Sequence, residues 1–192
     1  SSTGSAPLLP PIAGLKDRID NENHNIYSIL GMISHINDFP KDLEGKKVVV
    51  VGGGAVGLDV VEFFADRNAD ISIVEMMDQI GRDLDPVSKN DTKTMMKKHN
   101  VHQLTKTALL EVKDSSFLVR GDGEPYELPF EYGFVCLGMR AQGQLYQNLT
   151  EEFSSEDVEI MNIGDSQRAR RIIDGTQEGR NILTILEQKG YF

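Results

Sequence analysis

The chain is poor in cysteine and in long apolar runs, and each shortage excludes a class of protein. One cysteine, Cys136, excludes an internal disulfide framework, a Cys-x-x-Cys redox centre and an iron–sulfur cluster, which needs about four ligands. No apolar run approaches the roughly 20 residues of a membrane-spanning helix, and no basic-then-apolar leader opens the sequence. We therefore expect a cytoplasmic protein with no membrane partner, in which Cys136 is a small buried residue.

Positive charge is also scarce. Lys and Arg number 20 against 30 Asp and Glu, which gives a formal net charge of −10. An acidic chain of this kind repels phosphate backbones and anionic lipid, so we expect no nucleic-acid partner. The four histidines show no metal-ligand spacing, and we assign no metal site.

The length fits one domain plus pieces of a second. At roughly 150 residues per domain, the 192 residues exceed one domain but are too few for two. The opening SSTGSAPLLPPIAGL has neither helical nor strand period, and we expect it to be part of something longer. Apolar residues predict a buried strand over 47–51 and helices over 25–37 and 55–68, and a second short strand is predicted over 70–75. Asp85-Pro86, an acidic N-cap followed by proline, predicts the start of a helix over 85–100.

Short strands are predicted for the second half of the chain. They run over 101–105, 107–113, 116–120, 126–130 and 132–137, and their close succession suggests an antiparallel β-meander beside the parallel sheet. A strand over 158–163, a Gly-Asp turn and a helix over 171–188 follow. The predicted fold class is therefore α/β, a Rossmann-like three-layer dinucleotide-binding domain.

A glycine turn between strand and helix is the strongest chemical signal. In VVVVGGGAVGLDVVEFF, Gly52, Gly54 and Gly57 have G-x-G-x-x-G spacing. The first makes the tight turn, the second admits a pyrophosphate, and the third lets helix and strand pack closely. A glycine turn that binds nothing is the alternative, but the flanking strand and helix favour NAD(H) binding. The candidate residues are Gly52, Gly53, Gly54, Ala55, Val56 and Gly57.

Glu75 closes the second predicted strand, 18 residues after Gly57. A carboxylate there can accept hydrogen bonds from the adenosine ribose and would repel a 2′-phosphate, which favours NAD(H) over NADP(H). The alternative is a surface acid at a strand end. Arg82, in the following loop, could offset the repulsion between Glu75 and a 2′-phosphate.

Several segments together resemble a known family. From GKKVVVVGGGAVGLDVVEFF to FVCLGMR, the chain is similar to the pyridine-nucleotide half of old yellow enzyme-like NADH:flavin oxidoreductases. This group of two-dinucleotide-binding flavoproteins includes 2,4-dienoyl-CoA reductase, 2-enoate reductase and trimethylamine dehydrogenase. The likeness covers nearly the whole chain, and the segment pair that narrows it is VEMMDQIGRDLDP with GDSQRARRIIDGTQEG.

The resemblance implies a domain order, because in that family an NAD(H)-binding domain is inserted into an FAD-binding domain. It divides the chain into an FAD-domain segment with a connecting helix (1–44), the NAD(H)-binding domain (45–143) and the return to the FAD domain (144–192). The nucleotide domain would thus be flanked by FAD-domain remnants.

The resemblance also implies roles for single residues. Asp165 matches an aspartate that binds the FAD ribitol, and Gly138 matches a glycine beside the nicotinamide, although Ala141-Gln142 replaces the usual Pro-Asn. Asp59 stands where wider relatives carry a longer glutamate near the nicotinamide. The positions that match the exit from the FAD domain are Ser2, Thr3 and Gly4.

Three arginines near the last helix allow two interpretations. Arg168, Arg170 and Arg171 could form a solvated face or could face phosphate in an intact enzyme. Neither interpretation makes them catalytic, and we assign no catalytic residue in this chain.

Two functions from different classes follow. In the first, the chain is part of an enzyme that passes hydride from NADH to FAD and then, through an iron–sulfur cluster, to FMN and an enoate or enoyl-type substrate. FAD, FMN and the cluster would belong to the intact parent enzyme, whose FAD and FMN domains are the missing partners, and the isolated chain would be inactive. In the second, it is a free-standing NAD(H)-binding or sensing module without catalysis.

Overall fold

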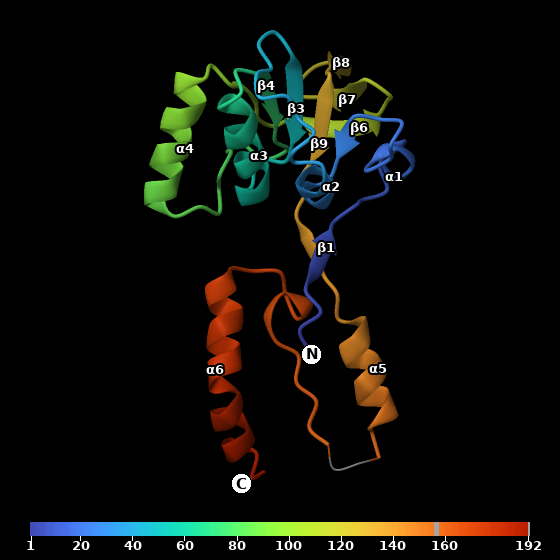
Figure 1. The fold of residues 1–192 in the computed structure, drawn as a ribbon, viewed down its shortest axis with the longest axis vertical. Coiled ribbons are helices and arrows are strands. Elements are labelled where there is room, and N and C mark those ends of the chain that lie inside the picture. Colours follow the sequence, from blue (N-terminus) through green and yellow to red (C-terminus); the bar gives the residue numbers. More distant parts are fainter. Residues whose placement is uncertain (156–157, 192) are drawn as a thin grey trace. The chain divides into compact units, whose positions relative to one another are not determined.

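The computed structural model describes residues 1–155 and 158–191 and divides the chain into two compact units (Figure 1). Pro7–Gly138 form one, which we call the sheet unit. Ser1–Ala6 and the chain from Met139 onward form the other, the terminal unit. No helix in the described ranges is long and apolar enough to cross a membrane.

A five-stranded parallel sheet is the centre of the sheet unit. Its strand order is β2-β9-β3-β4-β5, and every neighbouring pair is parallel. The central strand is buried on both faces, as expected for a run of four valines. The strands are β2 (Ile26–Tyr27), β3 (Lys47–Val51), β4 (Asp70–Val74), β5 (His102–Leu104) and β9 (Tyr132–Val135).

Helices cover one face of this sheet and antiparallel strands cover the other (Figure 1). Val48 and Val50 face a core shared with the helices, whereas Val49 and Val51 face a core shared with the antiparallel strands. The predicted three-layer Rossmann-like fold with a parallel sheet and a β-meander is confirmed. The helices on the first face are α2 (Ile29–Ser34), α3 (Ala55–Ala65) and α4 (Pro86–Lys98). The opposite face is covered by α1 (Leu15–Arg18) and by the antiparallel strands β6 (Ala108–Val112), β7 (Ser116–Arg120) and β8 (Tyr126–Pro129).

Two predictions for the sheet unit were wrong in part. The helix predicted over 25–37 begins as a strand, because Ile26 is fully buried beside β9, and α2 starts only after Ser28, whose Oγ accepts the Gly31 N–H at 3.1 Å. The meander has three strands rather than five. β5 and β9 join the parallel sheet instead, and β5 follows α4 as the return strand of a crossover.

The terminal unit contains one wrong prediction and several unpredicted elements. Residues 158–163 do not form a strand, and the backbone there donates one hydrogen bond across the unit, from the Ile163 N–H to the Ser1 carbonyl (3.0 Å). The helix predicted over 171–188 is present as α6 (Ile172–Gln188). The unpredicted elements are β1 (Ser5–Pro7), β10 (Met139–Ala141), which pairs with it, and α5 (Gln144–Glu152).

The two ends of the sheet unit meet. The Leu8 N–H donates to the Gly138 carbonyl at 2.9 Å, although 130 positions separate them in the chain. The chain therefore enters and leaves the sheet unit at adjacent positions.

Candidate functional site

Contacts within the sheet unit require glycine at Gly52, in the turn between β3 and α3, and at Gly57, in the first turn of α3. Gly52 has φ +109°, and a Cβ there would lie 2.1 Å from the Cys136 carbonyl oxygen. A Cβ on Gly57 would lie 1.9 Å from the Gly52 carbonyl oxygen. No side chain fits at either position, so the turn is tight and α3 packs directly on it.

The third glycine of the motif faces open space. A Cβ on Gly54 would meet no atom within 4 Å, and the residue is exposed. Gly54 is also the N-cap of α3, and no side chain caps this helix. Among the described residues, the N–H groups of Gly54, Ala55 and Val56 have no acceptor. Free amides at a helix start, with the partial positive charge of the helix, fit a diphosphate group.

Glu75 reaches the same turn from the neighbouring strand. It directly follows β4, and its half-buried carboxylate accepts the Gly53 N–H at 2.7 Å through Oε2. Its Oε1 accepts the Met77 N–H, also at 2.7 Å. The structure therefore brings Glu75 and the glycine turn together. The carboxylate keeps free lone pairs for ribose hydroxyls, because two oxygens offer about four acceptor positions.

The remaining candidate residues of the sheet unit include Gly138 and Arg82. Gly138 follows β9, which pairs with β3 in parallel, so it lies at the same carboxyl edge of the sheet as the turn; it is exposed with φ +105°. Ligands of open α/β sheets bind at this edge. Arg82 is exposed and, among the described residues, has no partner.

Asp59 lines a cavity of about 350 Å³ between α3 and α4. Desolvation raises the pKa of its carboxyl. Glu62 and Asp91 line the same cavity, so its charge disfavours phosphate. A diphosphate is therefore better accommodated at the glycine turn than in this cavity.

Cys136 is buried, as predicted. Burial, and secondarily the Asp59 charge, raises the pKa of its thiol to about 12. A thiol of this kind is inert at neutral pH, because the thiolate is the reactive form.

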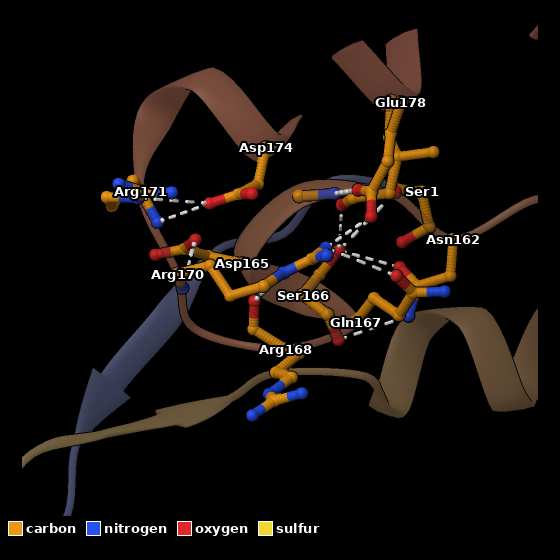
Figure 2. Close-up of polar contacts among 12 residues, drawn as sticks. Ser1, Asn162, Asp165, Ser166, Gln167, Arg168, Arg170, Arg171, Asp174 and Glu178 are labelled. Carbon is orange, nitrogen blue, oxygen red and sulfur yellow. Dashed lines mark hydrogen bonds and ion pairs between the residues drawn. The ribbon is translucent and has the colours of Figure 1, made fainter. Parts of the chain in front are cut away.

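The terminal unit builds a second glycine turn around Asp165 (Figure 2). Gly164 has φ +65°, and its N–H donates to Glu178 Oε2 at 2.7 Å. Asp165 accepts the Arg170 backbone N–H at 3.1 Å and the Ser5 hydroxyl at 3.2 Å. The Gly164 N–H, and then the side chain of Arg170, lower the pKa of Glu178. Sequence analysis missed Glu178, because nothing in the α6 pattern indicates a contact made 14 residues away.

The predicted exit segment lies in the same unit. The Thr3 hydroxyl donates to the Gln142 carbonyl, and the Gln142 N–H donates to the Gly4 carbonyl at 3.0 Å. Ser5 then connects this segment to Asp165. The structure thus brings Thr3, Gly4 and Asp165 into one unit.

The three arginines differ in their contacts. Arg170 pairs with Glu178, and the Arg171 guanidinium lies 3.8 Å from Asp174 (Figure 2). Arg168 is exposed, and its side chain has no partner among the described residues. Arg168 is therefore the arginine that an outside anion could reach without breaking an ion pair.

Comparison with known protein families agrees with this geometry. The family model of the pyridine nucleotide-disulphide oxidoreductases matches residues 2–162. The chain belongs to this family. With one buried cysteine, this member of the pyridine nucleotide-disulphide oxidoreductases carries no dithiol pair in the sequence given.

Individual relatives are redox enzymes of greater length. The chain is 26% identical over 179 residues to an NADH oxidase of Thermoanaerobacter brockii, which covers 93% of this chain and 26% of the relative. It is 24% identical to a metal reductase of Desulforamulus reducens, over 94% of this chain and 29% of the relative. A solved 2-naphthoyl-CoA reductase shares the fold, with a TM-score of 0.75 at 21% identity over 93% of this chain and 25% of that one. The chain therefore spans about a quarter of the length of these proteins.

Proposed function

We propose that the sheet unit binds NAD(H) and that the chain is the NAD(H)-binding part of a multidomain flavin-dependent oxidoreductase. In the parent enzyme, hydride would pass from NADH to FAD and on to FMN, to reduce an enoate or enoyl-type substrate. The terminal unit, with Thr3, Gly4 and Asp165, would be the remnant of the FAD domain. The domain boundaries at 44–45 and 143–144 are proposed from the family resemblance, and they differ from the limits of the sheet unit, Pro7–Gly138.

One observation carries the NAD(H) assignment. The N–H groups at the start of α3 have no partner among the described residues, a Cβ on Gly54 would meet no atom within 4 Å, and the Glu75 carboxylate bonds the N–H of the preceding residue, Gly53. Free amides suit the diphosphate, and the carboxylate suits the ribose hydroxyls. Gly138 lies at the same sheet edge and would lie beside the nicotinamide.

The electron path beyond NADH rests on different support. Family membership favours FAD as the acceptor, and the name of the NADH oxidase relative supports NADH as the donor. FMN, the iron–sulfur cluster and the enoate or enoyl-type substrate rest on the paired sequence segments that resemble the old yellow enzyme-like group. NADH would supply the hydride, and the residues of this chain would bind and orient it.

A calorimetric titration with NADH tests the binding proposal, and no heat of binding at millimolar NADH would contradict it. The competing proposal is a free-standing NAD(H)-binding module without chemistry. A flavin absorbance spectrum and an NADH-oxidation assay on the natural full-length protein separate the two. Flavin content with NADH oxidation supports the parent enzyme, whereas NADH binding without either supports the module.

A further inference from the structure

We infer that Glu75 shapes the diphosphate-binding turn itself, in addition to any contact with the ribose. This inference rests on the proposed NAD(H) function and assigns Glu75 a second role, as a positioning residue. The carboxylate lies against a backbone N–H of the glycine turn, so it acts on the turn before any nucleotide arrives.

The backbone on the Glu75 side is fixed. The Glu75 N–H donates to the Leu104 carbonyl at 2.8 Å, and the Glu75 carbonyl accepts the Thr107 N–H at 2.9 Å. The side chain then makes two charge-assisted hydrogen bonds, to the N–H groups of Gly53 and Met77. With both oxygens engaged, the carboxylate has one defined position rather than a set of rotamers.

The turn is shaped to receive this carboxylate. Gly53 is buried, and a Cβ there would lie 3.0 Å from Glu75 Oε2 and 3.1 Å from a side-chain carbon of Ile80. Glycine at this position therefore lets the acid approach the backbone. A larger residue would force the carboxylate or Ile80 to move.

The Gly53 carbonyl is held from the other side. It accepts the Gly81 N–H at 2.7 Å. Because a trans peptide points its carbonyl and its N–H in opposite directions, this bond directs the Gly54 N–H away from Gly81. Glu75 and Gly81 thus hold the two peptide units on either side of Gly53, and the second of these carries the free Gly54 N–H.

This role predicts that neutralising Glu75 weakens anion binding, whereas charge repulsion alone predicts that it strengthens anion binding. Removing a negative charge beside a phosphate site should strengthen anion binding by reducing repulsion. If Glu75 orders the turn, Glu75→Gln should weaken anion binding, because a side-chain amide can accept only one of the two N–H groups and presents its own NH₂ to the other.

The test uses ADP and 2′,3′-dideoxy-ADP, which lacks the ribose hydroxyls, with the whole chain. Affinities are read from ¹H–¹⁵N chemical-shift titrations, which also report the Gly53 amide and the folded state. We expect Glu75→Gln to shift the Gly53 amide and to weaken 2′,3′-dideoxy-ADP binding at least fivefold. Glu75→Asp, which keeps the charge but is one methylene shorter, should weaken it too and covers the case in which Gln does not fold. The matched control is Glu124→Gln, an exposed glutamate in the turn before β8, and should change affinity less than twofold.

Two results would overturn the inference. If a folded Glu75→Gln protein loses ADP affinity but keeps or gains affinity for 2′,3′-dideoxy-ADP, Glu75 contacts only the ribose, and the proposed NAD(H) function stands. If the unmodified chain binds neither ADP nor NADH, the proposed function fails and the inference fails with it.

Discussion

Gly54→Val should separate nucleotide binding from folding. Gly54 has φ −79° and ψ −179°, an extended conformation that valine adopts readily, and its Cβ would meet no atom within 4 Å. Valine is a poorer N-cap than glycine, and the expected stability loss is at most about 1 kcal/mol. The fold should therefore survive the substitution.

The binding loss follows from the free amides at the start of α3. The valine side chain would occupy open space at the start of α3, where the proposed diphosphate would bind. Hydrogen bonds to charged groups are each worth about 1.5–3 kcal/mol. Loss of one such bond corresponds to a roughly 10- to 150-fold weaker NADH affinity.

Calorimetric titration with NADH measures this loss, and circular dichroism checks the fold. Gly123→Val is the matched control, because a Cβ on Gly123 also meets no atom within 4 Å and this residue lies in the turn between β7 and β8. Unchanged NADH affinity in a folded Gly54→Val protein would remove this turn from the binding site.

The remaining predictions concern stability, cofactor choice and turnover. Gly57→Ala should lower the free energy of unfolding by about 1–3 kcal/mol in urea denaturation, because its Cβ would lie 1.9 Å from a carbonyl oxygen; the same stability as the unmodified chain would contradict the close packing. NADH should bind more tightly than NADPH, and Glu75→Ala should narrow the gap chiefly by weakening NADH; equal affinities in the unmodified chain at one salt concentration would point instead to Arg82 as a 2′-phosphate partner. Because burial raises the pKa of the Cys136 thiol from 9.0 to about 12, its stability contribution is complete below pH 9 and is lost as pH rises toward 12. The free energy of unfolding should then fall by up to about 1.4 kcal/mol per pH unit, and a slope unchanged in Cys136→Ala would exclude the thiol as its cause. The purified chain should be colourless and bind NADH without consuming it, even with excess FAD; a flavin absorbance band, or NADH oxidation above that of free flavin, would contradict this.

The elements that could be predicted from the sequence are those specified by residues close together in the chain. The strand, glycine turn and helix at 47–65 are specified by neighbouring residues, and Asp85 caps α4 through the N–H groups of Val87 and Ser88. The position of Glu75 at a strand end follows from the same short-range pattern. These elements depend on contacts within one or two turns of the chain.

Contacts between distant residues explain what the sequence could not predict. Pairing of β9 with β2 and β3 brings together residues more than 80 positions apart. The sequence of one strand does not determine which other strand it pairs with. The contact of Glu178 with Gly164 is of the same kind. The Glu75–Gly53 bond was also missed, because the spacing indicated the ribose as the partner of Glu75 and not the turn.

The hydrogen bond between Leu8 and Gly138 bears on how such a unit can spread among proteins. A domain whose entry and exit lie side by side can be inserted into a host at one surface position, because the host chain need not be stretched to span it. The same geometry permits the reverse operation, in which Pro7–Gly138 are deleted and the flanking residues are joined by a short linker. Insertion or removal at this single position would leave the five-stranded parallel sheet complete, because all of its strands lie within Pro7–Gly138.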